Sequence, residues 1–168
     1  MPIPWFRALH SVLDKLCITP LRLEDLEAVA WIEATSPSPW NLMQVKAEFQ
    51  NTDSIQLAAY LAGKLVGWCC GRVATGEAEL LKIAVGPLYR QKGIASRLLA
   101  RLERRLACLG AAAVFLEVRS QNTAALNLYL QTGYLRVGCR KKYYFMPEDD
   151  AVILRKNLLY PETWENKL

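Results

Sequence analysis

The chain has 168 residues, of which 52% are hydrophobic and 22% are charged, and its net charge is +5 at pH 7. This length and composition predict one folded domain with a full hydrophobic core and exclude a disordered chain. The mild positive charge favours an anionic ligand. The aromatic and basic motifs of the common RNA-binding modules are missing, so we expect no direct nucleic-acid binding.

Cysteine content and hydropathy indicate the compartment. The five cysteines are an odd number, contain no C-x-x-C pair and are accompanied by one histidine. We therefore expect reduced thiols and no metal site. The sequence shows neither the pattern of a secretory leader nor an apolar run long enough to span a bilayer. These features predict a cytoplasmic protein that does not bind membranes.

The first residues predict an amphipathic extension over positions 1–16, because apolar side chains recur there at helical spacing after Pro4. We favour an extension that covers part of the core over one that docks on a partner. The folded domain is placed at residues 17–160, and residues 161–168 are expected to form a tail.

The next elements are read from apolar periodicity and from turn residues. A Pro-punctuated loop at 36–40 separates two helices, and Asn41 is expected to cap the second of them. In chain order the predicted elements are a strand at 17–23, a helix at 26–34, a helix from 42 to 50, hairpin strands at 56–61 and 65–73, and a turn at Gly76.

The central stretch predicts a strand, a basic turn and an amphipathic helix. The strand Leu80–Val85 is stopped by Gly86-Pro87, and a helix begins near Ile94, with an apolar stripe that reaches Leu109. Gly93 lets the backbone approach an anion, and the first N–H groups of the helix point toward it. This turn therefore predicts a pyrophosphate site, with an ordinary solvated turn as the alternative.

A second informative stretch runs from residue 112 to residue 134. A buried strand at 114–118 carries Glu117 near its carboxyl end, where ligands of open sheets commonly bind. Asn122 is expected to cap the following helix, Gly133 to end it, and Tyr129 lies two turns into it. Alternatively, Glu117 is a strand-end carboxylate paired with arginine or water, and Tyr129 is a half-buried core aromatic.

These motifs resemble a known family. Arg90-x-x-Gly93-x-Ala95 resembles the Gln/Arg-x-x-Gly-x-Gly/Ala acetyl-CoA motif of the GNAT superfamily of N-acetyltransferases. The run from Leu116 to Tyr134, followed by basic and aromatic residues at 140–144, resembles the RimI-type ribosomal-protein alanine N-acetyltransferases over residues 17–158. Ser38-Pro39-Trp40 resembles the Pro-Trp substrate loop of that group.

The resemblance implies an α/β (α+β) fold of GNAT type: a mixed, mostly antiparallel twisted sheet with a V-shaped opening between two central strands, flanked by helices. It implies Glu117 as proton acceptor and Tyr129 as proton donor in catalysis, Trp40 and Tyr143 as substrate contacts, acetyl-CoA as co-substrate and no metal. The implied acetyl-CoA contacts are Ile83, Ala84, Val85, Arg90, Gln91, Lys92, Gly93, Ile94, Ala95, Ser96 and Asn122.

The acceptor follows from the resemblance and from acid–base chemistry. An α-amino group with a pKa of about 7.8 is neutral in roughly one molecule in seven at pH 7, whereas a lysine is neutral in roughly one in two thousand. A single carboxylate therefore suits the N-terminal amine of a protein, with a ribosomal protein as the acceptor that the resemblance implies. The alternatives are a small-molecule amine, a lysine side chain, or a non-catalytic acyl-CoA-binding module.

Two further expectations concern the route and the acceptor. No cysteine has a histidine partner by spacing, so we expect direct attack in a ternary complex rather than transfer through a thiol. The acidic residues at 148–150 either receive a basic peptide or form a solvated turn.

Overall fold

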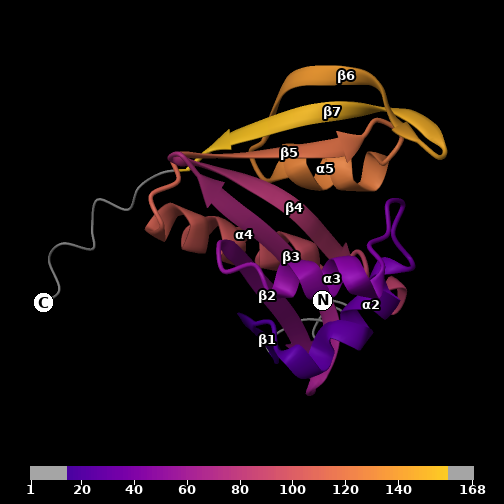
Figure 1. Ribbon diagram of the computed structural model, residues 1–168, viewed down its shortest axis with the longest axis vertical. Helices are drawn as coiled ribbons and strands as arrows, with labels where there is room; N and C mark the ends of the chain where they lie inside the picture. The colour runs from indigo at the N-terminus through magenta and orange to yellow at the C-terminus, as the bar shows by residue number, and fades with distance from the viewer. Residues whose placement is uncertain (1–14, 159–168) are drawn as a thin grey trace, which may run out of the picture. The chain divides into compact units, whose positions relative to one another are not determined.

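The computed structural model describes residues 15–158, so the predicted tail and nearly all of the N-terminal extension lie outside the described part. The described strands form one sheet in the order β1-β2-β3-β4-β5-β7-β6 (Figure 1). The elements are β1 (Leu16–Pro20), η1 (Leu23–Asp25), α2 (Leu26–Glu33), α3 (Leu42–Phe49), β2 (Ser54–Leu61), β3 (Lys64–Ala74), β4 (Glu77–Val85), η2 (Pro87–Tyr89), α4 (Ile94–Cys108), β5 (Ala113–Arg119), α5 (Thr123–Gln131), β6 (Leu135–Phe145) and β7 (Glu148–Asn157).

The strand pairings confirm the predicted mixed, mostly antiparallel sheet. The pairs β1–β2, β5–β7 and β6–β7 are antiparallel, and β4–β5 is parallel. The β4–β5 register covers two pairs, Ala78 with Val114 and Glu79 with Phe115, near the start of each strand.

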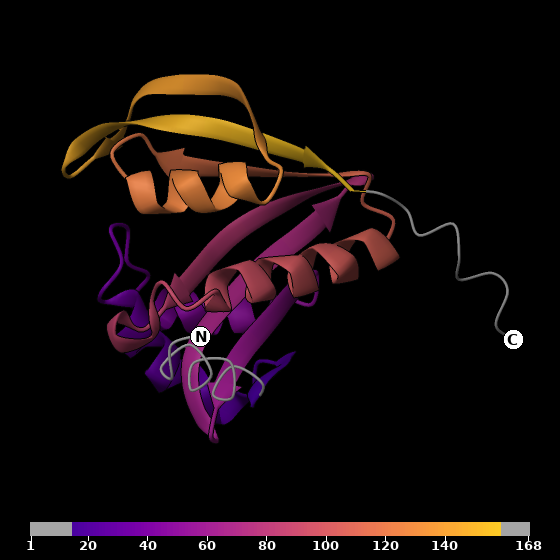
Figure 2. The same ribbon diagram turned by 180° about the vertical axis from the view of Figure 1, so that it is seen from behind.

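Two compact units divide the described chain. Residues 15–70 and 82–102 form the first unit, and residues 71–81 and 103–158 form the second. In the first unit, α2 and α3 lie on one face of the strands and the N-terminal part of α4 lies on the other (Figures 1 and 2). In the second unit, α5 lies on one face of the β5–β7–β6 ribbon (Figure 1).

The packing of α4 depends on a missing side chain in β3. Ile94, Leu98 and Leu102 of α4 are almost completely buried. A Cβ atom on Gly67 would lie 3.0 Å from the carbonyl oxygen of Ala84 and 3.3 Å from Cδ1 of Leu98. Glycine at this position therefore lets the helix and the end of β4 approach β3 closely.

Helix boundaries follow the predicted capping residues. Asn41 and Gln44 form a reciprocal capping box at the start of α3, and the Asn122 side chain accepts a hydrogen bond from the Ala125 amide at the start of α5. Gly133, with a φ of +93°, follows the end of α5 as expected.

Several predicted boundaries differ from the structure, by one to three residues. The first strand ends at Pro20 rather than at residue 23, since the chain turns into η1 at Leu23. The central strand starts earlier than predicted, at Glu77. Leu109 is 61% exposed, because α4 ends at Cys108 and the apolar stripe therefore stops at Leu106.

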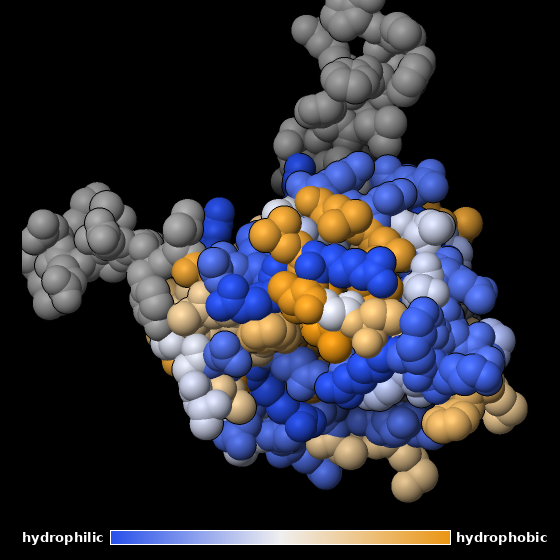
Figure 3. All heavy atoms as spheres, turned by 90° about the horizontal axis from the view of Figure 1, so that it is seen from above, coloured by the Kyte–Doolittle hydropathy of each residue, from blue (hydrophilic) through white to orange (hydrophobic). Residues whose placement is uncertain are grey.

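The edge strand β6 is mostly exposed and mixes basic with apolar side chains. Its exposed apolar residues include Leu135, Val137 and Phe145. Orange and blue atoms are intermixed in the space-filling view from above (Figure 3). Charged residues along an edge strand disfavour pairing with a further strand.

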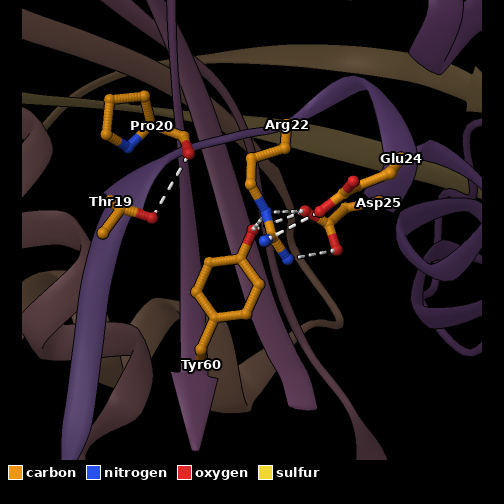
Figure 4. Close-up of polar contacts among 6 residues, drawn as sticks. All are labelled: Thr19, Pro20, Arg22, Glu24, Asp25 and Tyr60. Atoms are coloured by element: carbon orange, nitrogen blue, oxygen red, sulfur yellow. Dashed lines mark hydrogen bonds and ion pairs between the residues drawn. The ribbon is translucent and has the colours of Figure 1, made fainter. Parts of the chain in front are cut away.

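A buried carboxylate fixes the entry into α2. Asp25 accepts hydrogen bonds from Tyr60 Oη at 2.5 Å and from Arg22 Nε at 2.8 Å, and Arg22 also contacts the exposed Glu24 (Figure 4). Burial by itself raises the pKa of Asp25. The hydrogen bonds from Arg22 and Tyr60 and the guanidinium charge outweigh it, so the pKa of Asp25 is lowered.

We predict that Asp25→Asn destabilises the protein by roughly 1–3 kcal/mol near neutral pH. The folded pKa of Asp25 lies below its unfolded value of about 3.9, so the contribution is present above that pH and is lost as the pH falls through the folded pKa. Urea unfolding of both proteins at about pH 7 and about pH 3.5 measures the difference, which should shrink at the lower pH.

Glu24→Gln is the matched control, because Glu24 contacts the same arginine from an exposed position. It should change the free energy of unfolding by less than about 1 kcal/mol at either pH. A pH-independent loss in Asp25→Asn would contradict the assignment.

Candidate functional site

The basic turn before α4 presents open backbone. Gly93 has a φ of +75° and Gln91 a φ of +58°, and a Cβ atom on Gly93 would meet no heavy atom within 4 Å. The first N–H groups of an α-helix lack intrahelical acceptors and carry a partial positive charge. A 15-residue helix therefore begins directly after an exposed glycine, where the backbone is open to a phosphate group.

The side chains of this turn differ in where they point. Ile94 is buried, so a ligand contact at this residue falls to its backbone, whereas Ala95 and Ser96 are half-buried. Lys92 donates to the Leu88 carbonyl oxygen at 2.9 Å and lies 5.6 Å from the Tyr89 ring centroid.

Arg90 joins the turn to two other segments. Its Nε donates to the Val85 carbonyl oxygen at 2.9 Å, and its Nη2 donates to the carbonyl and hydroxyl oxygens of Thr35 at 3.0 and 2.8 Å. This guanidinium is therefore engaged by protein groups and holds together the end of β4, the turn and the residues that follow α2.

The predicted substrate loop rests on a buried carboxylate. Glu33 Oε2 accepts a hydrogen bond from the Trp40 amide, and Glu33 Oε1 accepts one from Trp68 Nε1, each at 3.0 Å. The rings of Trp40 and Trp68 lie 6.0 Å apart, and Lys82 Nζ lies 5.2 Å from the Trp40 ring centroid. Neither Glu33 nor Lys82 was predicted as a site residue, although each interrupts an apolar segment.

Glu117 lies in a polar cluster of the second unit. Its Oε1 is 2.9 Å from Arg140 Nη1, and 22% of its side chain is exposed. A hydrogen bond with the Glu117 carboxylate, together with its charge, raises the pKa of Tyr143. Arg140 also lies over the Tyr143 ring at 5.3 Å. The cluster thus brings together the predicted residues Glu117 and Tyr143. The ion pair with Arg140 is the pairing with arginine that was the alternative for Glu117, although the sequence did not indicate which arginine.

Tyr129 and Asn122 occupy α5 and its N-cap. Tyr129 is 6% exposed, more buried than the half-buried alternative, and its ring meets that of Tyr134 edge to face at 5.5 Å. Asn122, a predicted cofactor contact, already serves as the cap of α5.

The predicted site residues therefore fall into two sets. Those of the first unit are Trp40, Ile83, Ala84, Val85 and the turn residues 90–96. Those of the second unit are Glu117, Asn122, Tyr129 and Tyr143. Ala84 and Val85 are buried at the end of β4. The next amide, of Gly86, donates a hydrogen bond to the Val66 carbonyl oxygen at 2.9 Å.

The acidic residues at 148–150 bind groups of their own unit. Asp149 is buried and accepts hydrogen bonds from the Ser120 hydroxyl at 2.6 Å and the Gln121 amide at 3.3 Å. Asp150 contacts Lys141 Nζ at 2.7 Å. The hydrogen bond from Ser120 lowers the pKa of Asp149, and the one from Lys141 lowers that of Asp150.

All five cysteines are free thiols. Cys69 and Cys70 are completely buried in β3, and burial raises the pKa of both thiols well above the ordinary value. Within residues 15–158, no group of three His, Cys, Asp or Glu side chains is arranged to hold a metal ion.

Comparison with known proteins identifies the family. The acetyltransferase (GNAT) family matches residues 22–134, which is more than half of the chain, so the chain belongs to this family.

Bacterial relatives match the chain over most of its length. The N-alpha-acetyltransferase RimI of Mycobacterium tuberculosis is 34% identical over 86% of this chain and 94% of its own. The ribosomal protein bS18-alanine N-acetyltransferase of Escherichia coli is 32% identical over 82% of this chain and 94% of its own. An uncharacterized protein of Mycobacterium leprae is 32% identical over 85% of this chain, which spans 41% of that longer protein.

A solved structure agrees with these relatives. The crystal structure of the ribosomal-protein alanine N-acetyltransferase from Escherichia coli has a TM-score of 0.79 and 29% sequence identity, and the match covers 91% of this chain and 99% of that one. The predicted GNAT fold is therefore confirmed.

Of the helices between residues 15 and 158, none has the length and apolar content needed to cross a membrane.

We predict that iodoacetamide labels Cys17 and Cys108 of the folded protein, which are exposed, and labels Cys69 and Cys70 only after unfolding. Peptide mass spectrometry before and after addition of guanidinium chloride measures the labelling at each site. Acetyl transfer by the folded, labelled protein should persist, because the proposed transfer uses no thiol. Modification of Cys69 or Cys70 in the absence of denaturant, with loss of transfer in parallel, would instead indicate a thiol route.

Proposed function

We propose that this chain transfers acetyl from acetyl-CoA to the N-terminal α-amine of a protein, with a ribosomal protein as the acceptor class. The observation that carries the proposal is the partly exposed carboxylate of Glu117 near the carboxyl end of β5, held by Arg140 beside Tyr143. Two relatives matched over 94% of their length are named RimI and ribosomal protein bS18-alanine N-acetyltransferase, which supports the same acceptor.

The turn before α4 fits the diphosphate of acetyl-CoA. Open space in front of Gly93 leaves room for an anion against the backbone, and a long helix begins there. Arg90 and Lys92 bind carbonyl oxygens and so fix the turn, while the amides of residues 91–96 would hold the phosphates. The backbone of Ile83, Ala84 and Val85 and the side chain of Asn122 complete the proposed contacts.

The proposed chemistry assigns one proton transfer to each of two side chains. Acetyl-CoA supplies an acyl group activated as a thioester, whose C–S bond breaks as the bond to the acceptor nitrogen forms. Glu117, directly or through a water, accepts a proton from the acceptor ammonium. Tyr129 donates its phenolic proton to the departing sulfur, and the second proton of the nitrogen, lost as the amide forms, passes through solvent to restore the phenol. Charge and protons then balance without a covalent enzyme intermediate, with the proton taken by Glu117 released to solvent.

We assign acceptor contacts to Trp40 and Tyr143. The Trp40 amide and ring are fixed by Glu33 and Trp68, and Tyr143 is held by Glu117 and Arg140. Aromatic faces of this kind suit the apolar and backbone parts of a short peptide. Both substrates of the proposed reaction are available in the cytoplasm, where we place the protein.

We predict that Glu117→Gln and Tyr129→Phe each lower kcat for acetylation of an N-terminal peptide by about 100-fold or more, because each removes one proton-transfer group. The KM for acetyl-CoA should stay within about twofold, since neither side chain is assigned to cofactor binding. Initial rates by mass spectrometry of the acetylated peptide measure both constants.

Matched controls make the same two substitutions at residues that are not assigned to the reaction. Tyr134→Phe deletes a hydroxyl from the ring that packs on Tyr129, and Glu79→Gln neutralises an exposed carboxylate on β4. Both should retain kcat within about threefold. Full activity in Glu117→Gln and Tyr129→Phe, with acetyl-CoA binding retained, would support a non-catalytic acyl-CoA-binding module instead.

We also predict that a peptide with a free N-terminal alanine is acetylated with a kcat/KM at least about 100-fold above that of the same peptide with a blocked N-terminus and one internal lysine. The neutral fractions of the two amines at pH 7 differ by more than that factor. A panel that adds free small amines separates the alternatives, and preference for the lysine or the small amine would exclude the proposed acceptor.

A further inference from the structure

The loop at 35–40, which joins α2 to α3, is anchored through its main chain. The Trp40 amide donates to Glu33, the Ser38 carbonyl oxygen accepts from Lys82 Nζ, and the Thr35 carbonyl oxygen accepts from Arg90. Each anchor is a side chain from outside the loop, and all of these groups belong to the first unit. Side chains from α2, β4 and the turn before α4 therefore help to fix the loop backbone.

Glu33 is the centre of this arrangement. Its side chain is completely buried at the last residue of α2, and its carboxylate accepts from the Trp40 amide and the Trp68 indole. A buried carboxylate is costly unless it is paired and hydrogen-bonded. The pairing charge comes from Lys82, whose Nζ lies 3.4 Å from Oε2.

Lys82 links the carboxylate to the loop. It lies on β4 directly before Ile83, its side chain is only 14% exposed, and its ammonium contacts Glu33 Oε2, the Ser38 carbonyl oxygen and the face of the Trp40 ring. A single ammonium thus connects α2, the loop and the strand that leads into the proposed thioester-binding backbone.

We infer that Glu33 and Lys82 are positioning residues that hold Ser38-Pro39-Trp40 in the conformation that receives the acceptor peptide. The inference rests on the proposed function, in which Trp40 contacts the acceptor. Its consequence is selective: loosening the anchor raises the KM for the peptide, while kcat and the KM for acetyl-CoA stay nearly constant.

A purely stabilising role would not explain why Glu33 and Lys82 bind main-chain groups of the loop. Well-packed apolar residues stabilise a buried site as well as an ion pair does. Here the carboxylate and the ammonium each contact a main-chain group of the loop, at Trp40 and Ser38, and both lie against Trp40. Such contacts specify a backbone conformation, which an apolar pair would not do.

The test compares wild type with Lys82→Met in N-terminal peptide acetylation. We expect the KM for the peptide to rise about tenfold, with kcat and the KM for acetyl-CoA within about twofold. Lys82→Arg retains a cation and donors and should restore the peptide KM to within about threefold of wild type. Lys64→Met, the same change in the exposed β2–β3 hairpin, should leave all three constants unchanged.

A second measurement does not depend on activity. Amide hydrogen exchange should be faster at Thr35 to Asn41 in Lys82→Met than in wild type, with β3 and α4 unaffected. The double variant Glu33→Gln/Lys82→Met removes both charges, so no buried charge is left unpaired, and it carries the test if the single variant fails to fold. It should show the same rise in peptide KM.

The outcomes separate the two proposals. If wild type acetylates the peptide and the folded variants keep its peptide KM, the positioning role is wrong and the proposed function stands. Unchanged exchange at Thr35 to Asn41 would likewise overturn the role. If wild type acetylates no N-terminal peptide, the proposed function fails, and the acceptor-positioning role fails with it even where exchange shows that Lys82 anchors the loop.

Discussion

The close approach of α4 to β3 at Gly67 is the constraint on which the first unit depends. With no side chain at this residue, Leu98 reaches the strand and the end of β4 lies against the same backbone. The buried apolar stripe of α4 then fixes the helix axis, and the axis fixes where the first-turn amides point. The absence of a side chain at Gly67 thus helps to set the position of the turn that we propose binds the phosphates of acetyl-CoA.

In the second unit, charged side chains join the segments around Glu117. Glu117 is placed by strand pairing, opposite Ile153 of β7, and Arg140 of the next strand reaches its carboxylate. Asp149 and Asp150 hold neighbouring segments through Ser120 and Lys141. Each of these carboxylates binds a partner from another segment, so the contacts restrict how the segments move relative to one another.

The sequence predicted correctly those features that depend on interactions between neighbouring residues. Asn41, Asn122 and the start of α4 at Ile94 were confirmed, since capping groups and apolar periodicity act within a few residues. β6 gave no strand prediction, because its exposed basic side chains obscure the alternation of a half-buried strand. β7 was also missed, although it carries the buried apolar residues Ala151, Val152 and Leu154.

Contacts between distant residues were beyond sequence reasoning. Glu33 and Lys82 are 49 positions apart, and Glu117 and Arg140 are 23 apart, so neither ion pair leaves a local signal. The resemblance supplied the fold and the family, which the comparisons confirm, whereas the roles of Glu117, Tyr129 and the turn residues stay predictions.

The hydrogen bonds of Arg90 depend on the shape of its guanidinium group. Its planar fork reaches the carbonyl oxygens of Val85 and Thr35 and the Thr35 hydroxyl at once, which a lysine ammonium on a flexible stem does not reproduce. Glutamine, the other residue of the resembled motif, also ends in a flat group with more than one N–H donor. Replacing Arg90 with lysine would therefore keep the positive charge but lose the simultaneous contacts to the end of β4 and to the residues that follow α2.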